Sequence, residues 1–304
     1  MKVDWKGVMP ALTTKFTKED TLDLEMFQNN LNAQLDAGVS GIILGGTLGE
    51  ASTLSPEEKR ELTRFSKDEV GDQIPVIVNV AEQTTKAAIR AVEIAEEDGA
   101  SGIMMLPPMR YRADDRETIE FFRETAKSTF LPIMIYNNPV DYKIEVTANM
   151  FEELLKEENI QAVKESTRDV TNVTRLINRF GDRLKILTGV DTIAMESLVM
   201  GADGWVAGLV CAFPKESVAI YRLVKAGKIE EAREIFRWFL PVLELDINSK
   251  LVQNIKLAEV ATGIGTENVR APRLALEGEE RQRVQKIIDN AMRTRPNVEE
   301  EKLI

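Results

Sequence analysis

The hydrophobic residues of this chain fall into eight short runs, separated by stretches whose apolar positions have helical spacing. The runs recur about every 30 residues, the size of one βα unit. Several are apolar at consecutive positions, which is typical of strands buried on both faces of a parallel sheet. The predicted strands are residues 7–14, 41–46, 75–80, 102–108, 132–136, 160–165, 184–189 and 204–208.

Two of the intervening helices have clear end signals. In residues 24–38 apolar residues recur every three or four positions, and Gly38 is a helix-ending residue. The run Ser55-Pro56-Glu57-Glu58 combines an N-cap serine, a first-turn proline and a capping-box glutamate, so it predicts a helix start.

Eight βα units ending near residue 226 predict an α/β fold, a closed (β/α)8 TIM barrel. A doubly wound dinucleotide-binding sheet would have G-x-G-x-x-G after its first strand, and that spacing is absent. Beyond residue 226 the pattern is helical only, over 228–244, 249–262 and 278–294. We therefore expect a catalytic barrel over residues 1–226 and a C-terminal helical extension over residues 227–304.

Composition removes several classes of chemistry. The chain has no histidine, which excludes His-dependent nucleophile relays and His-ligated metal sites, and its one cysteine, Cys211, cannot form an intrachain disulfide. A net charge of -11 disfavours a nucleic-acid partner. Without an apolar run of membrane-spanning length or a signal peptide, we expect no membrane partner and a cytoplasmic protein.

The best candidates for chemistry lie at the carboxyl ends of predicted strands, where barrel enzymes place reactive groups. Lys164 follows an apolar strand, so burial would lower the pKa of its amine and make it a nucleophile. Tyr136 ends the neighbouring strand and could move protons in place of a histidine. Taken singly, each could equally be a solvated strand-end residue. The glycine-rich turn that contains Thr47 offers backbone N–H groups suited to a carboxylate.

Together these strand ends resemble the dihydrodipicolinate synthase / N-acetylneuraminate lyase family of class I aldolases. The resemblance rests on the runs GTLGE (46–50), YNNP (136–139) and KE (164–165), and on residues 204–208. It implies that Lys164 forms an imine with a 2-oxo acid, that Tyr136 relays protons and that Thr47 hydrogen-bonds to the Tyr136 phenol. It also implies a homotetramer, a dimer of dimers, without metal or organic cofactor. The substrate-binding residues implied are Gly46, Leu48, Asn138, Ser166, Gly189 and Val206.

Departures from the family pattern narrow the expected substrate. Asp141 stands where the synthase has an arginine for its aldehyde substrate, and Met109 stands where the synthase lends a tyrosine to a neighbouring subunit. Thr192 replaces an acidic residue of the sugar-acid lyases. Two further runs, LPPM (106–109) and CAFP (211–214), are similar to the branch that converts 1-pyrroline-4-hydroxy-2-carboxylate to 2-oxoglutarate semialdehyde. We expect a deaminase of this kind; the alternatives are 4-hydroxy-tetrahydrodipicolinate synthase and a 2-keto-3-deoxy sugar acid aldolase.

Two readings from other classes remain open. Glu50, Glu165 and Asp191 could hold magnesium in a metal-dependent barrel lyase, because carboxylate oxygens are its usual ligands. Chelator would then abolish activity. Alternatively, the barrel could bind a small acid without turnover, which predicts saturable binding and no imine.

Overall fold

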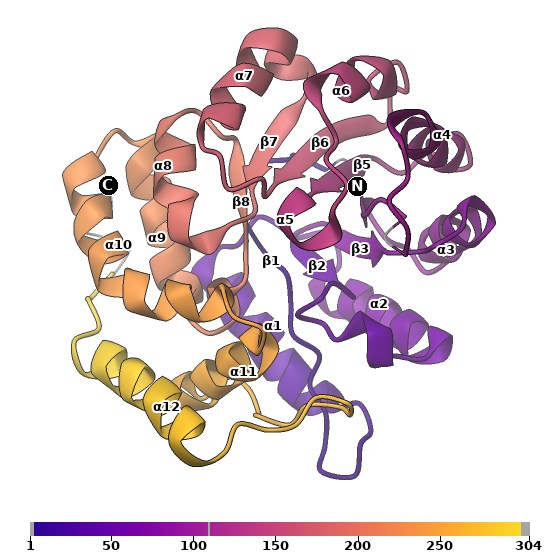
Figure 1. Ribbon diagram of the computed structural model, residues 1–304. Helices are drawn as coiled ribbons and strands as arrows, with labels where there is room; N and C mark the ends of the chain where they lie inside the picture. The colour runs from indigo at the N-terminus through magenta and orange to yellow at the C-terminus, as the bar shows by residue number, and fades with distance from the viewer. Residues whose placement is uncertain (1–2, 109, 299–304) are drawn as a thin grey trace.

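In a computed structural model, which describes residues 3–108 and 110–298, eight parallel strands form one sheet (Figure 1). The sheet curves around a central axis. The sheet order is β1-β8-β7-β6-β5-β4-β3-β2, and a bridge between Ala11 and Ile43 joins its two ends. All eight predicted strands are present, so the predicted (β/α)8 barrel is confirmed. The strands are β1 (Gly7–Pro10), β2 (Ile42–Leu44), β3 (Val76–Val80), β4 (Gly102–Met105), β5 (Ile133–Asn137), β6 (Ile160–Glu165), β7 (Lys185–Thr188) and β8 (Gly204–Ala207).

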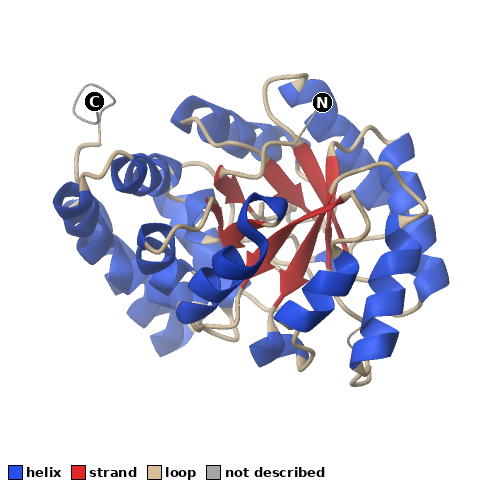
Figure 2. Ribbon diagram, turned by 90° about the horizontal axis from the view of Figure 1, so that it is seen from above, coloured by secondary structure: helices blue, strands red, loops and turns tan. Residues whose placement is uncertain are grey.

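Helices surround the strands, and Figure 2, turned by 90° from Figure 1, shows the sheet enclosed by them. The predicted end signals are confirmed: Gly38 caps the first helix with φ 78°, and Ser55 and Glu58 form a reciprocal capping box at the second. The helices around the barrel are α1 (Leu24–Ala37), α2 (Pro56–Val70), α3 (Thr85–Glu97), α4 (Asp115–Ala126), α5 (Pro139–Tyr142), α6 (Ala148–Leu154), α7 (Thr171–Phe180), α8 (Ala194–Val199) and α9 (Pro214–Lys225). Short 3-10 helices are η1 (Ala51–Thr53), η2 (Gly181–Arg183), η3 (Asp191–Ile193) and η4 (Leu209–Cys211).

Three further helices follow α9 and gather on one side of the barrel (Figure 1). They are α10 (Ile229–Leu243), α11 (Leu251–Thr262) and α12 (Gly278–Arg293), with the 3-10 helix η5 (Glu244–Asp246) after α10. The helix α10 packs on α9, and α12 packs on both α10 and α11. In the described part of the chain, no helix has the length and apolar character needed to cross a membrane.

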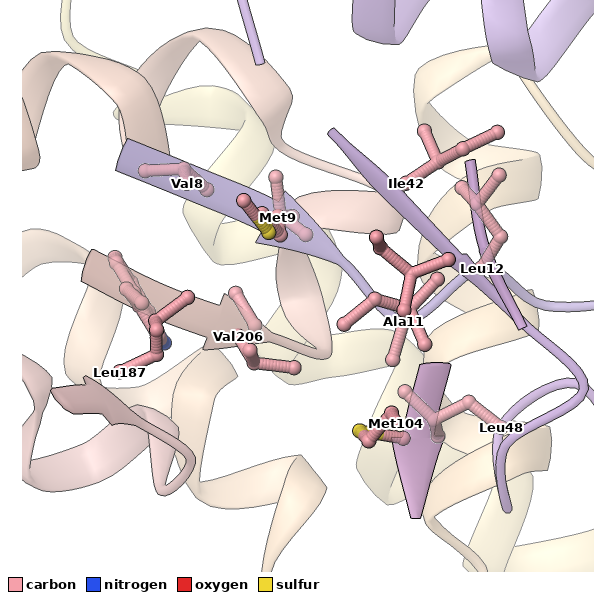
Figure 3. Packing of buried hydrophobic residues seen from close by; sticks show 14 of the residues in the cluster. Val8, Met9, Ala11, Leu12, Ile42, Leu48, Met104, Leu187 and Val206 are labelled. Atoms are coloured by element: carbon pink, nitrogen blue, oxygen red, sulfur yellow. The ribbon is translucent and has the colours of Figure 1, made fainter. Parts of the chain in front are cut away.

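Apolar side chains fill the inside of the barrel, so the strands enclose a core rather than a channel. Met9, Met104 and Val206 are among these buried residues, and Figure 3 shows Leu48 beside Met104 at one end of this packing. Cys211 is also buried, and its thiol donates to the carbonyl of Ala11 at 3.3 Å. Burial raises the pKa of this thiol well above its usual range, so Cys211 belongs to the packing.

Candidate active site

A cavity of about 1160 Å³ opens at the carboxyl ends of the strands. The nine residues that the sequence analysis predicted as catalytic or substrate-binding all line it, although they come from distant parts of the chain. Strand ends and the loops after them bring these groups together, as expected for a barrel. They are Gly46, Thr47, Leu48, Tyr136, Asn138, Lys164, Ser166, Gly189 and Val206.

Lys164 lies near the end of β6 with its side chain 8% exposed. Lys164 pairs in register with Tyr136 on β5, and its Nζ lies 4.0 Å from the centre of the Tyr136 ring. Desolvation lowers the pKa of the Lys164 amine, although nearby acidic groups partly oppose this. A larger fraction of this amine is therefore in the neutral, nucleophilic form than in a solvated lysine.

The space that Lys164 occupies exists because residue 189 is glycine. A Cβ at Gly189 would lie 2.6 Å from Cγ and 2.7 Å from Cε of Lys164, and 2.2 Å from Oγ of Ser166. These separations are far below van der Waals contact, so any larger residue would displace the lysine. Gly189 thus leaves the room in which the Lys164 side chain lies.

Tyr136 presents its hydroxyl in the same cavity. The hydroxyl accepts a hydrogen bond from Nδ2 of Asn138 at 3.2 Å. Burial raises the pKa of Tyr136 to about 12, so its phenol keeps its proton at neutral pH and can donate it.

Thr47 does not make the hydrogen bond that the resemblance implied. Its hydroxyl lies 3.2 Å from the hydroxyl of Tyr142, not of Tyr136. Tyr142 ends α5, and its ring meets the Tyr136 ring edge to face with centres 5.5 Å apart. The position of Tyr142 at the end of α5 accounts for the difference, because its phenol lies within hydrogen-bond distance of Thr47. Burial raises the pKa of Tyr142 to about 12 as well. The sequence analysis did not single out Tyr142.

The turn after β2 offers donors for a carboxylate. Asn79 donates to the carbonyl of Gly45 at 2.9 Å and fixes the turn. Within residues 3–108 and 110–298, no hydrogen-bond acceptor engages the N–H of Thr47 or of Leu48. Both residues line the cavity, so these two amides are free to bind an anionic group there.

Opposite charges meet at the rim near α5. Asp141 accepts a hydrogen bond from Asn138 at 2.7 Å, and its Oδ1 lies 4.0 Å from Nη2 of Arg168. Arg168 and Arg273 both line the cavity. Sequence reasoning missed both, because each lies in a loop outside the recognised motifs.

The three carboxylates considered for magnesium belong to separate networks. Glu50 accepts from Lys256 at 2.6 Å, and Glu165 accepts from the Thr167 amide at 2.8 Å. Asp191 accepts from the Trp205 indole and from two backbone amides. Among the described residues, no three potential ligands of the His, Cys, Asp and Glu types converge on one point. These carboxylates therefore position neighbouring backbone and side chains.

Comparisons with known proteins agree on one family. The sequence model described as the dihydrodipicolinate synthetase family matches residues 4–291. A 4-hydroxy-tetrahydrodipicolinate synthase of Pelodictyon phaeoclathratiforme is 30% identical over 274 residues, which cover 90% of this chain and 93% of the relative.

Solved structures agree in fold. The 4-hydroxy-tetrahydrodipicolinate synthase of Methylacidiphilum fumariolicum has a TM-score of 0.90 at 26% identity, covering 95% of this chain and 96% of that one. The dihydrodipicolinate synthase of Aquifex aeolicus has a TM-score of 0.89 at 26% identity, covering 93% and 97%.

Proposed function

Because the chain belongs to the dihydrodipicolinate synthetase family, and is thus an enzyme of the class I aldolase type, we propose that Lys164 forms an imine with its substrate. The observation that carries this proposal is the buried Lys164 amine beside the Tyr136 phenol in one cavity. The amine attacks C2 of a 2-oxo acid or of its cyclic imine, and Tyr136 supplies and recovers the protons. The free amides of Thr47 and Leu48 hold the carboxylate on C2.

The substrate we propose is 1-pyrroline-4-hydroxy-2-carboxylate. Lys164 adds to the ring C=N bond and the ring nitrogen leaves as an amine, so the ring opens. The C4 hydroxyl then leaves as water, the double bond migrates, and hydrolysis releases 2-oxoglutarate semialdehyde, ammonia and the free lysine. One water is consumed overall and no external oxidant or reductant is required.

The charge at the rim supports this choice. The substrate has one carboxylate, which the turn after β2 can bind. At the opposite rim Asp141 partly neutralises Arg168, since their charged atoms are 4.0 Å apart. A second carboxylate there would meet Asp141 beside Arg168, so it would find little net positive charge. A neutral hydroxylated ring needs no such charge.

The second candidate is 4-hydroxy-tetrahydrodipicolinate synthesis from pyruvate and aspartate semialdehyde. Relatives such as the Pelodictyon protein carry that name. Arg168 and Arg273 are two of the cations in the cavity wall, and either could bind the second substrate's carboxylate. If either arginine binds the carboxylate of aspartate semialdehyde, its condensation with pyruvate becomes the main reaction.

Two assays on one preparation decide between these functions. We expect ammonia release from 1-pyrroline-4-hydroxy-2-carboxylate and little condensation of pyruvate with aspartate semialdehyde. Efficient condensation together with a silent ammonia assay would establish the second candidate instead.

The covalent step has its own test. Borohydride treatment with pyruvate should add one pyruvate-derived adduct, which peptide mapping locates at Lys164. Lys164→Arg should lose this adduct, whereas Lys185→Arg, at the start of the adjacent strand β7, should retain it. Wild-type enzyme that gives no adduct, or an adduct elsewhere, would exclude the imine at Lys164.

We also propose that the chain assembles as a homotetramer, as the family resemblance implies. Multi-angle light scattering on the purified protein should give four times the chain mass. A monomer or dimer that retains full activity would contradict this assembly.

A further inference from the structure

The wall of the cavity includes a carboxyl group from the C-terminal helices. Asp246 ends the 3-10 helix η5 (Glu244–Asp246) and lines the cavity together with Lys164 and Tyr136. Its Oδ1 comes so close to Gly208, at the end of β8, that a Cβ there would lie 2.8 Å from it. Within the described ranges, no N–H or O–H group donates a hydrogen bond to the Asp246 side chain, and no cation pairs with it at 4.0 Å or less. Its oxygens are therefore directed at the contents of the cavity.

The charged groups around Asp246 come from several elements. Asp191 of η3, Lys164 of β6, Asp141 of α5 and Arg168 of the loop after β6 all act on it electrostatically. Burial and the adjacent Asp191 raise the pKa of Asp246 to about 8.

The carboxyl groups of Asp191 and Asp246 act on each other electrostatically, and their surroundings differ. Asp191 accepts hydrogen bonds from the Trp205 indole at 2.9 Å and from the Leu209 amide at 2.8 Å. Such donors stabilise a carboxylate, and Asp246 has none. The pair therefore holds its proton on Asp246, which is the member that faces the cavity.

Ser166 provides independent evidence for a polar ligand in the same cavity. Its side chain is 2% exposed, and its hydroxyl makes no hydrogen bond of acceptable geometry in the described chain, although it lies near the Tyr136 phenol. A buried hydroxyl without a partner costs free energy unless a ligand satisfies it. The cavity is thus built for a substrate with polar atoms beyond its carboxylate.

We propose that Asp246 is the general acid that protonates the departing hydroxyl of the substrate. This inference rests on the proposed deaminase function. Tyr136 gives its proton to the ring nitrogen as the ring opens to the Lys164 imine, and its phenolate then takes a proton from C3 to give the enamine. The nitrogen electron pair then restores the C2=N bond, the C3=C4 bond forms and the C4–O bond breaks. Asp246 gives its proton to the leaving oxygen, which departs as water, and Asp246 is left as a carboxylate.

The product charges favour this step. The Asp246 carboxylate forms while the Lys164 nitrogen carries the positive charge of the restored iminium. The two charges face the same cavity, so the new anion is stabilised as it appears. Water in the open cavity returns the proton to Asp246 before the next turnover.

The test compares Asp246→Asn with Glu244→Gln, which removes an exposed carboxyl from the same 3-10 helix. Asp246→Asn should keep borohydride trapping of pyruvate but lose ammonia release from the ring imine by about 10²–10⁴-fold. Glu244→Gln should retain both activities. Trapping Asp246→Asn with the ring imine should give an adduct heavier by one water than the dehydrated adduct of the wild type, because elimination is blocked.

The pH profile gives a second readout. Wild-type kcat should fall as the pH rises through about 8, because the acid form of Asp246 is lost. The residual activity of Asp246→Asn should lack this decline.

Near wild-type ammonia release by Asp246→Asn, or a dehydrated adduct on that variant, overturns the role of Asp246 and leaves the deaminase function standing. If the wild-type enzyme traps pyruvate but releases no ammonia from the ring imine, both the role of Asp246 and the deaminase function are overturned.

Discussion

Replacing Gly189 by alanine tests whether the position of the Lys164 amine controls the reaction. The added methyl would lie about 0.7–0.8 Å inside the 3.4 Å of ordinary contact with Cγ and Cε of Lys164. Gly189 has no positive φ, so the clash rather than backbone strain is the cost. A displacement approaching 1 Å at a reacting group slows catalysis on the order of 10²-fold. Overpacking should also lower the free energy of unfolding by about 1–3 kcal/mol.

Gly102→Ala is the matched control. A Cβ there would lie 3.0 Å from Cδ1 of Ile77 and from the Pro132 carbonyl, at the start of β4 and away from the cavity. It should lower stability by a similar amount but leave imine formation unchanged. The assay is the rate of borohydride-trapped adduct with pyruvate, alongside urea denaturation of each variant. If Gly189→Ala forms the adduct at the wild-type rate, the argument from space around the lysine is refuted.

Three further predictions concern single groups. Tyr136→Phe should fold normally but slow turnover by about 10²–10⁴-fold, measured by steady-state kinetics, because one proton donor is lost. Lys256→Met should lower the free energy of unfolding by about 3–5 kcal/mol, since it removes the fully buried ion-pair partner of Glu50 and leaves Glu50 with Arg273 at 3.7 Å; the double change with Glu50→Leu should recover most of this in denaturant titrations. Asp246 has a folded-state pKa of about 8, above its unfolded value, so its contribution to stability is lost as the pH rises from about 4 through 8. Asp246→Asn should therefore show a smaller fall in Tm between pH 6 and pH 9 than the wild type; an equal fall would contradict the raised pKa.

The barrel could be predicted from sequence because each strand is a short apolar run between helical stretches. The position of Lys164 beside Tyr136 followed from the strand ends alone, since neighbouring parallel strands end at the same edge. The motif-based residues such as Gly189 were found through the resemblance, but the reason for glycine there became visible only from the three-dimensional contact with Lys164.

Other parts of the site could not be predicted, for physical reasons. Asp246 lies in a helical region with no strand-end signal, and its environment depends on how the C-terminal helices pack on the barrel. Arg168 adopts a positive φ of 65° in a loop, a conformation that no periodic pattern indicates. The partner of Thr47 was predicted wrongly because Tyr142 lies in the short helix α5, whose position does not follow from strand register.

The contribution of the C-terminal helices has a consequence for how the enzyme is made. A ribosome delivers the chain from its N-terminus, so every barrel strand, with Lys164 and Tyr136, is synthesised before Asp246 and Lys256. Until Lys256 emerges, Glu50 beneath the glycine-rich turn lacks its buried cation. The proposed nucleophile is therefore synthesised before the residues that complete its cavity wall, and we expect activity only once the last quarter of the chain has been made.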